Sequence, residues 1–572
     1  MTASPRFPGF LGLALALLLG MGSPGLAQDE PAPAEEELQT EPLPEAQPAE
    51  PEPEPEPSAP VPSGRTGPTL HGDLSLSLED AIRMGLENNL DVEVVRYSPY
   101  VAYEDVRQAW GAYDPELFAD FAYQNFELEN SFQITGQTLS EDREWAGAGG
   151  FRGIVPLLGS SYNLQYDSGR FETNSRVEAL SPKYESSFNV GISQPLLRDL
   201  VWNPPWYRVR STRIFYQSSL DQFRKDVMDV VQNIQNLYWN LIARQDQVRV
   251  AEKSLETARA LLEQTRTQHE VGVVSRVEVV EAEAGVAQRE FEQIRAQNLY
   301  RNSQDQLIDA VLGTGLTADS TLQIQPTDRP DDYIPFDIDP EVAVATAFEQ
   351  RPEVALADQE IEQRDISLRF AKNQRLPRLD GHVSYGNQGI AGSQNPDAID
   401  FSTGDPLPPG TIPSRPWDTS MDRFLGNDAA EQVVAGAFFS IPLPNTSARH
   451  RVSQAELELR RANSLKRRTE QSIILEVRTA IRNLRDSQQG IEAARRATVA
   501  AEEQLRAERI RLEYGESTPF DVLLRESDLV SAQSEEINAF QAYRTSATGL
   551  DRAQGTILRN SNISIDAVRA LR

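Results

Sequence analysis

The chain has 572 residues, no cysteine, four histidines and a formal charge of −31 at pH 7. Without cysteine there can be no disulfide, thiolate nucleophile or cysteine-ligated metal, and His71, His269, His382 and His450 are too far apart to predict a histidine site. So negative a charge also argues against nucleic acid as a partner, because phosphate binding needs a basic surface.

The N-terminal residues predict two segments that do not belong to the folded part. Residues 1–27 resemble a signal peptide, with a positive start at Arg6, a short apolar run and small residues before a cleavage site at Ala27. Residues 28–68, rich in Pro, Glu and Ala, predict a disordered acidic tail. No apolar stretch after residue 27 reaches eighteen residues, so any membrane crossing would not use a helix.

The rest of the chain contains an internal repeat. Residues 78–92 align with residues 340–354 at an offset of 262, and Val271-Gly272 aligns with Tyr514-Gly515 at an offset of 243. This duplication predicts two tandem units, 69–325 and 326–572.

Each unit is expected to contain a long helix, at about 205–271 and about 445–514. Mostly apolar residues recur there every seven positions, as is typical of coiled-coil packing: Ile234, Leu241, Val248, Leu255 and Leu262, and Val477, Leu484, Ile491, Thr498, Leu505 and Leu512. Nearly 70 helical residues would extend about 100 Å. Gly272 and Gly515 are expected to end these helices in turns, followed by return helices at about 275–313 and 518–555, while 91–113 and 353–374 supply shorter helices.

Strands are expected between the helices. After Pro115 and after Pro377 the pattern changes to alternating apolar and polar residues, and 188–193 and 435–440 predict returning strands. Residues 145–155 and 162–167 predict an additional hairpin, so the number of strands per chain is either four or six. Such alternation is typical of outer-membrane β-barrels, but so few strands cannot close one, so several chains must share the barrel.

The order and duplication of these elements resemble the TolC-type outer membrane efflux protein family over about residues 74–560. The resemblance rests on the paired segments beginning at Leu78 and Pro340, the strand starts at Pro115 and Pro377, the Gln194-Pro-Leu-Leu197 element and the two Gly-turn elements. It implies a mixed α and β fold: a trimeric outer-membrane β-barrel continuous with a long coiled-coil α-helical barrel in the periplasm. It also implies a passive duct for efflux or type I secretion. The expected partners are a periplasmic adaptor protein, an inner-membrane RND or ABC pump and the outer-membrane lipid bilayer.

The resemblance also suggests a periplasmic constriction near the helix-hairpin turns at Gly272 and Gly515. Asp521 matches an acidic position of that constriction, and Glu278 matches an acid that holds the entrance closed. The second acid of the ring is replaced by Leu524, with Arg525 beside it. The alternative is that Asp521 is a solvated or helix-capping carboxylate.

Other positions of the expected gate depart from the family pattern. Leu512 and Ser517 stand where a Tyr and an Arg are expected, and Tyr514, Arg276 and Arg525 are possible substitutes.

Two other functions were weighed against the duct. A periplasmic coiled-coil adaptor or a structural scaffold without a pore would also contain long helices, although the duplication favours the duct. No nucleotide-binding or nucleophile motif is found, so we expect no enzyme, no catalytic residue, no metal and no cofactor.

Overall fold

The computed structural model describes residues 71–129, 139–313, 321–329, 338–426 and 429–565. The predicted signal peptide (1–27) and acidic tail (28–68) lie outside these residues. The described chain forms two compact units, which we call the sheet unit (Arg107–Ser211 and Ile366–Glu456) and the helical unit (residues 71–106, Thr212–Asp365 and the chain from Leu457 onward). Within the described ranges, no helix combines the length and the apolar character needed to cross a membrane.

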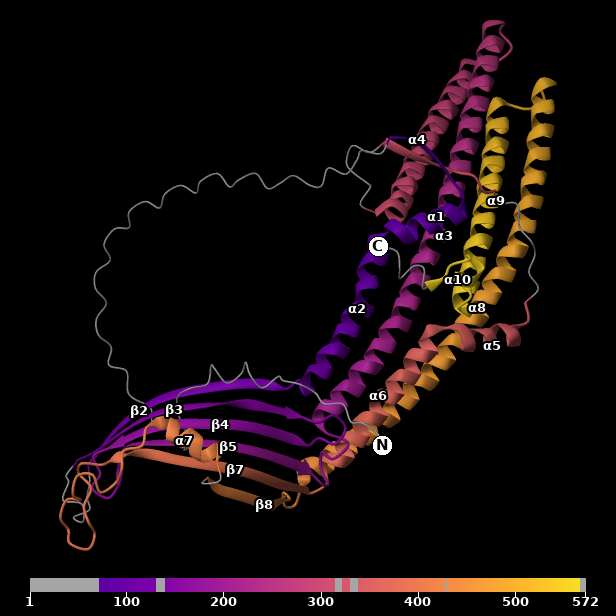
Figure 1. The fold of residues 1–572 in the computed structure, drawn as a ribbon. Coiled ribbons are helices and arrows are strands. Elements are labelled where there is room, and N and C mark those ends of the chain that lie inside the picture. Colours follow the sequence, from indigo (N-terminus) through magenta and orange to yellow (C-terminus); the bar gives the residue numbers. More distant parts are fainter. Residues whose placement is uncertain (1–70, 130–138, 314–320, 330–337, 427–428, 566–572) are drawn as a thin grey trace, which may run out of the picture. The chain divides into compact units, whose positions relative to one another are not determined.

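The sheet unit contains one antiparallel sheet of six strands, visible in Figure 1 as a single curved layer. The order across the sheet is β2-β3-β4-β5-β7-β8, so β2 and β8 are its two edges. The strands are β2 (Glu116–Glu129), β3 (Leu139–Ile154), β4 (Ser161–Thr173), β5 (Leu180–Pro195), β7 (Arg378–Gln394) and β8 (Ala430–Ser440). The additional hairpin suggested by the sequence is therefore present, as β3 and β4.

The two faces of this sheet differ in chemistry. We call one the apolar face, because cross-strand partners there are mostly aromatic or aliphatic, such as Tyr123 opposite Trp145 and Val190 opposite Tyr385. The other, the polar face, carries pairs such as Glu116 opposite Arg152 and Ser193 opposite His382. This alternation is the period of two that the sequence predicted.

A short helix, α7 (Trp417–Leu425), packs on the apolar face where that face is lined by small residues. The hydroxyls of Ser420 and Ser186 lie 2.8 Å apart, and Trp417 Nε1 donates to Ser168 Oγ at 2.9 Å. A side chain at Gly389 would collide with the Ser420 carbonyl. Helix α7 was not predicted from the sequence, since it lies in the long connection between β7 and β8.

The helical unit is dominated by two hairpins (Figure 1). The first joins α3 (Pro204–Glu270) to α4 (Arg276–Leu312), and the second joins α8 (Thr446–Glu513) to α9 (Pro519–Gln554). These bounds agree closely with the predicted long and return helices. Most of the predicted seven-residue series is buried, including Ile234, Leu241 and Val477.

The predicted inward position Leu262 is only half-buried. The structure buries Leu261 more fully, after Leu255 and Ala258. Leu261 packs there against Leu505 and Val522 of the second hairpin, so the contact between the hairpins decides which residue faces inward.

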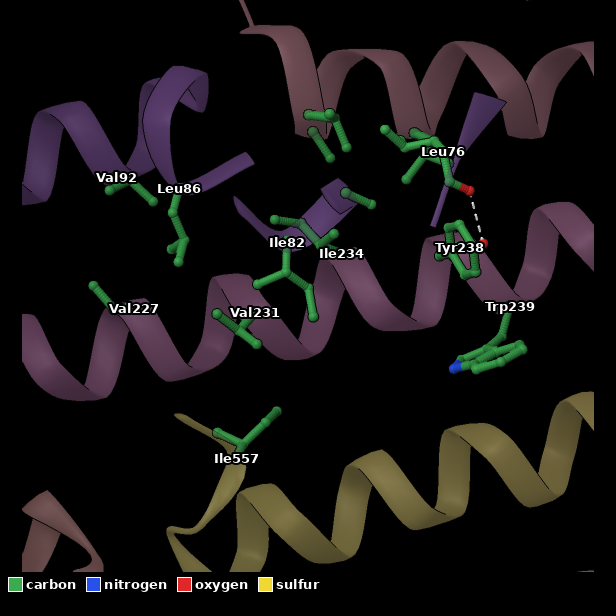
Figure 2. Packing of buried hydrophobic residues seen from close by; sticks show 14 of the residues in the cluster. Leu76, Ile82, Leu86, Val92, Val227, Val231, Ile234, Tyr238, Trp239 and Ile557 are labelled. Atoms are coloured by element: carbon green, nitrogen blue, oxygen red, sulfur yellow. Dashed lines mark hydrogen bonds between the residues drawn. The ribbon is translucent and has the colours of Figure 1, made fainter. Parts of the chain in front are cut away.

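A compact core beside the first hairpin adds to the helical unit. Helices α3 and α4 pack here against two short helices, α1 (Leu78–Asn88) and α10 (Ile557–Asn560). They also pack against a parallel two-stranded sheet, formed by β1 (His71–Leu76) and β6 (Thr321–Pro326). Figure 2 shows Ile82 and Leu86 of α1 against Val231 and Ile234 of α3. The buried Tyr238 hydroxyl donates to the Leu76 carbonyl at 2.9 Å, which ties α3 to β1 (Figure 2).

Each half contains a break between two short helices, and we call these breaks the first and second joints. The first joint, at Asn89, separates α1 from α2 (Leu90–Trp110), which ends in a 3-10 turn at Gly111–Tyr113. The second joint, at Arg351, separates α5 (Pro340–Gln350) from α6 (Pro352–Gln374). Asn89 and Arg351 are equivalent in the repeat, at the offset of 262.

Candidate functional site

The two hairpin turns are built in the same way. Gly272 and Gly515 adopt positive φ values of 80° and 72°, a conformation that costs glycine little. In each turn the residue after the glycine closes the helix end: Val273 N donates to the Gln268 carbonyl at 2.8 Å, and Glu516 N donates to the Arg511 carbonyl at 2.9 Å. These bonds satisfy carbonyls at the end of each long helix, so each chain reverses within a few residues.

Both acids expected at the constriction lie three residues after the N-cap of a return helix. The Ser275 amide and hydroxyl donate to Glu278 Oε1 at 3.2 and 3.1 Å. The Thr518 amide and hydroxyl donate to Asp521 Oδ2 at 3.3 and 2.7 Å. Each arrangement is a capping box, which satisfies amides that the first helical turn leaves unpaired. The carboxylates therefore have a structural role in their own hairpins.

Asp521 is held in its charged form. Its hydrogen bonds from the Thr518 side chain and amide lower the pKa of this carboxyl, and Arg525 lowers it further. The helix N-terminus, where amides point outward, also favours negative charge. At neutral pH the tip of the second hairpin thus presents a fixed anion that remains partly exposed to solvent.

The other predicted gate residues have separate surroundings. Leu524 is exposed, and Arg525 Nη1 lies 3.0 Å from Asp528 Oδ2 on the same helix. Tyr514 is 79% exposed beside its glycine turn. Ser517 donates from its hydroxyl to Glu508 Oε1 at 2.5 Å.

Behind the tips, a small apolar cluster holds the two hairpins together. Leu261 of α3, Leu505 of α8 and Val522 of α9 are buried against one another, with Leu512 packed at the margin. A side chain at Gly285 of α4 would lie 2.7 Å from Leu523 Cδ1, so α4 and α9 approach closely there. Leu512 therefore contributes to packing at the position where a gate tyrosine was expected.

A buried carboxyl, which sequence reasoning missed, lies next to this cluster. Glu526 is only 3% exposed, and its Oε2 has no hydrogen-bond partner among the described residues. Burial raises the pKa of Glu526, although the nearby charges of Arg289 and Arg509 and the Ser254 hydroxyl oppose this. The signal was available in the spacing of Pro519, Val522 and Glu526, which follows the inward face of a helix.

Glu526 has a repeat counterpart with different surroundings. At the offset of 243 its equivalent is Glu283, which is exposed and lies 2.8 Å from Arg266 Nη2. Near Glu526, the buried Arg289 instead pairs with Glu292 at 2.6 Å. The acid is thus repeated in the sequence, but only the copy on α9 is enclosed.

The tips present solvated charged groups and packed apolar side chains. Among the described residues, no cluster of three or more His, Cys, Asp or Glu could hold a metal ion. The arrangement presents fixed negative charge at the hairpin ends. Separation of the two hairpins would break the apolar contacts of Leu261 with Leu505 and Val522.

Solved structures with a similar fold are outer membrane channels. The CmeC channel of Campylobacter jejuni is 14% identical, with a TM-score of 0.59, covering 86% of this chain and 90% of its own. VceC of Vibrio cholerae is 14% identical (TM-score 0.58, covering 84% and 96%). MtrE of Neisseria gonorrhoeae, in its open state, is also 14% identical (TM-score 0.56, covering 84% and 89%). At this identity the likeness shows the fold.

Comparison with curated proteins by sequence finds no match. A family model, in contrast, matches both halves of the chain. The model for the outer membrane efflux protein aligns with residues 153–314 and 343–556, well over half of the sequence. The chain therefore belongs to the outer membrane efflux protein family.

Proposed function

We propose that three copies of this chain form a passive exit duct through which solutes leave the periplasm and cross the outer membrane. The observation that carries the proposal is the combination, in one chain of this family, of a one-sided six-stranded sheet with two long helical hairpins. The protein resides in the outer membrane of a Gram-negative bacterium, as its family does.

The sheet is suited to a bilayer only when it joins the sheets of neighbouring copies in one barrel. Its apolar face would contact lipid, whereas the polar groups of edge strands β2 and β8 need partners, because the hydrocarbon core contains no water to bind them. Closure with neighbouring copies satisfies both edges. The number of copies, three, is taken from the resemblance to the TolC-type family.

The polar face would then line water. Its carboxylates outnumber its cationic side chains. The carboxylates are Glu116, Asp120, Asp142, Glu144, Asp167, Glu185 and Asp380, and the cations are Arg152, Lys183 and Arg378. Such a lumen favours cations over anions.

The hairpin tips would form the periplasmic entrance. Three copies of Asp521 around an axis would make a ring of carboxylates, with Leu524 and Arg525 one turn further along α9. Glu278 would supply a second set of acids from the other hairpin. Since both acids also cap helices, we propose that they set the charge of the entrance while keeping the tips rigid.

A periplasmic adaptor protein and an inner-membrane pump would complete the export pathway, as the resemblance implies. The alternative of an adaptor or scaffold without a pore does not account for a six-stranded sheet with a continuous apolar face. For the same reason we propose transport without catalysis.

The experiment is to fractionate membranes, extract the protein in mild detergent and image single particles. We expect outer-membrane location and a three-fold particle with a strand-rich end and a helical end. A monomer recovered in the periplasmic fraction would contradict the duct and, with it, the roles given to the tip residues.

A further inference from the structure

The sheet of this chain contains a hairpin, β3–β4, that widens the wall. Each strand of this hairpin is also paired with its outer neighbour. Strand β3 pairs with β2 from Arg152 opposite Glu116 to Leu139 opposite Glu129. Strand β4 pairs with β5 from Ser161 opposite Ser193 to Phe171 opposite Lys183. We propose that three copies close a barrel of eighteen strands, whose lumen admits solutes about as wide as two helices side by side. This inference rests on the proposed function.

The hairpin has the composition of a membrane wall rather than of a plug. On the apolar face, Trp145 of β3 contacts Tyr123 of β2, with ring centroids 5.1 Å apart. On the polar face, Arg152 binds Glu116 through two hydrogen bonds of 2.7 and 2.8 Å. Both faces of β3 therefore continue the chemistry of the neighbouring strand.

The polar face is left open among the described residues. Helix α7 packs on the apolar face of this sheet, at Ser168 and Ser186. The polar face instead has two shallow hollows of about 490 and 520 Å³, the first lined by Glu144, Asp167 and Glu185 and the second by Glu116 and His382. These hollows leave room for water on the polar face, and the sheet itself is curved (Figure 1).

The edges fit closure by copies of the same chain. Successive strands of the sheet alternate in direction, and their number is even, so β2 of one copy is antiparallel to β8 of the next. The edge strands have 14 and 11 residues, so both reach at least the 9–11 tilted residues needed to cross a bilayer. Each edge strand therefore pairs with the edge strand of a second copy of this chain.

The width follows from the strand number. With strands about 4.8 Å apart and tilted by about 40°, eighteen strands give a backbone diameter of about 36 Å, and twelve give about 24 Å. Side chains occupy about 5 Å on each side, since packed sheets lie about 10 Å apart. The free lumen is then about 26 Å, against about 14 Å for twelve strands. An α-helix is about 10–12 Å wide, so only the larger lumen admits a helical hairpin.

The barrel would therefore not be the part of the duct that limits cargo size. Polypeptides or other polymers that retain local structure could pass through it, whereas a twelve-stranded barrel would require a single helix or an extended chain. The size limit would lie at the helical tips.

The first test is to count strands in single-particle images of the full-length protein. Eighteen strands are expected. A three-fold particle with twelve strands, and with β3–β4 outside the wall, would overturn this inference but leave the duct intact. A particle without a membrane barrel would overturn the duct itself.

A second test measures the lumen separately from the tips. Polyethylene glycols of increasing size are added only on the barrel side of a planar bilayer, where they lower conductance if they enter. Polymers about 20 Å across should enter the wild-type barrel and be excluded from a variant lacking residues 139–173, which joins β2 to β5 and keeps the strand directions alternating. Exclusion of these polymers from the wild type would overturn the inference, even if the deletion variant fails to fold.

Discussion

The two joints occupy equivalent places in the repeat, but they are stabilised by different chemistry. At the first joint, the neutral Asn89 side chain accepts from the amides of Asp91 and Val92 at 2.8 and 3.1 Å and donates to the Ala310 carbonyl at 2.9 Å. At the second joint, the buried Arg351 guanidinium binds Glu353 at 2.8 Å and Glu476 at 2.5 Å.

The ion pairs of the second joint extend further into the helical unit. Arg552 of α9 binds the same Glu353 at 3.0 Å and Asp229 of α3 at 2.6 Å. The second joint thus connects α6, α8, α9 and α3 through charge, whereas the first relies on local capping and packing. The same backbone break can be stabilised by neutral capping bonds or by ion pairs, but only the stability that comes from the ion pairs should depend on pH.

The largest expected effect comes from removing the shared carboxylate. Burial alone would raise the pKa of Glu353, but hydrogen bonds from Arg351 and the charge of Arg552 lower it to about 2. Relative to an unfolded pKa of about 4.3, this corresponds to about 3 kcal/mol of stability at neutral pH. We expect Glu353→Gln to lower the free energy of unfolding at pH 7 by about that amount, measured by chemical denaturation followed by helical circular dichroism.

The pH dependence and a matched control sharpen this prediction. Since the folded pKa is lowered, the stabilisation is present above about pH 4.3 and is lost as the pH falls toward 2, so the difference between wild type and variant should shrink in that window. The control is Asp91→Asn, the exposed equivalent at the first joint, expected within about 0.5 kcal/mol of wild type. Equal effects of the two substitutions would contradict the contrast between the joints.

A smaller effect is expected at the first joint itself. Asn89→Ala removes the acceptor for two amides at the start of α2, so we expect a loss of about 1–2 kcal/mol. Because no charge is involved, this loss should be the same at pH 3.5 and pH 7, measured by the same denaturation. A loss that disappears at low pH would mean that the first joint also depends on ionised groups.

The hairpin tips repeat the contrast with the acid pair Glu526 and Glu283. Burial raises the pKa of Glu526, so its folded state favours the protonated form and loses stability as the pH rises through the range between its unfolded and folded pKa values. We expect Glu526→Gln to raise the melting temperature at pH 8 and to leave it nearly unchanged at pH 4. Glu283→Gln is the control, since that acid is exposed and should change little at either pH. A destabilised Glu526→Gln at pH 8 would indicate that the ionised carboxylate is required.

The smallest effect on stability is expected at the entrance. Asp521→Asn keeps an acceptor for the Thr518 amide, so it should cost a few tenths of a kcal/mol while removing one negative charge per copy. In planar bilayers we expect reduced cation selectivity, compared with Asp528→Asn about two turns further along α9 as a control. Unchanged selectivity would place the Asp521 carboxylates away from the conducting path.

Much of this architecture could be predicted from the sequence because it depends on local patterns. The bounds of α3, α4, α8 and α9 follow from apolar periodicity and from glycines that end helices, and the strands follow from alternation. The burial of Leu261 was missed because it depends on contacts with Leu505 and Val522 of the other hairpin, which a repeat within one helix does not reveal.

The remaining features depend on residues far apart in the chain. Arg351 gave no sign of its role, because Glu476 and Arg552 lie 125 and 201 positions further along. Helix α7 packs on strands β4 and β5 through Ser168 and Ser186, which look like ordinary strand residues. At the tips, the residue types of Asp521 and Glu278 were identified, but their capping bonds required the structure.

The position of the β3–β4 hairpin has a consequence for how this family can vary. Because the two added strands run in opposite directions, β5 keeps the orientation it would have without them, and the connection to α3 is undisturbed. A single added strand would reverse every later strand and, in the proposed duct, would start the long helix α3 at the opposite surface of the bilayer. The circumference of the proposed three-fold barrel could therefore change only in increments of six strands, and pore widths between these increments would not occur.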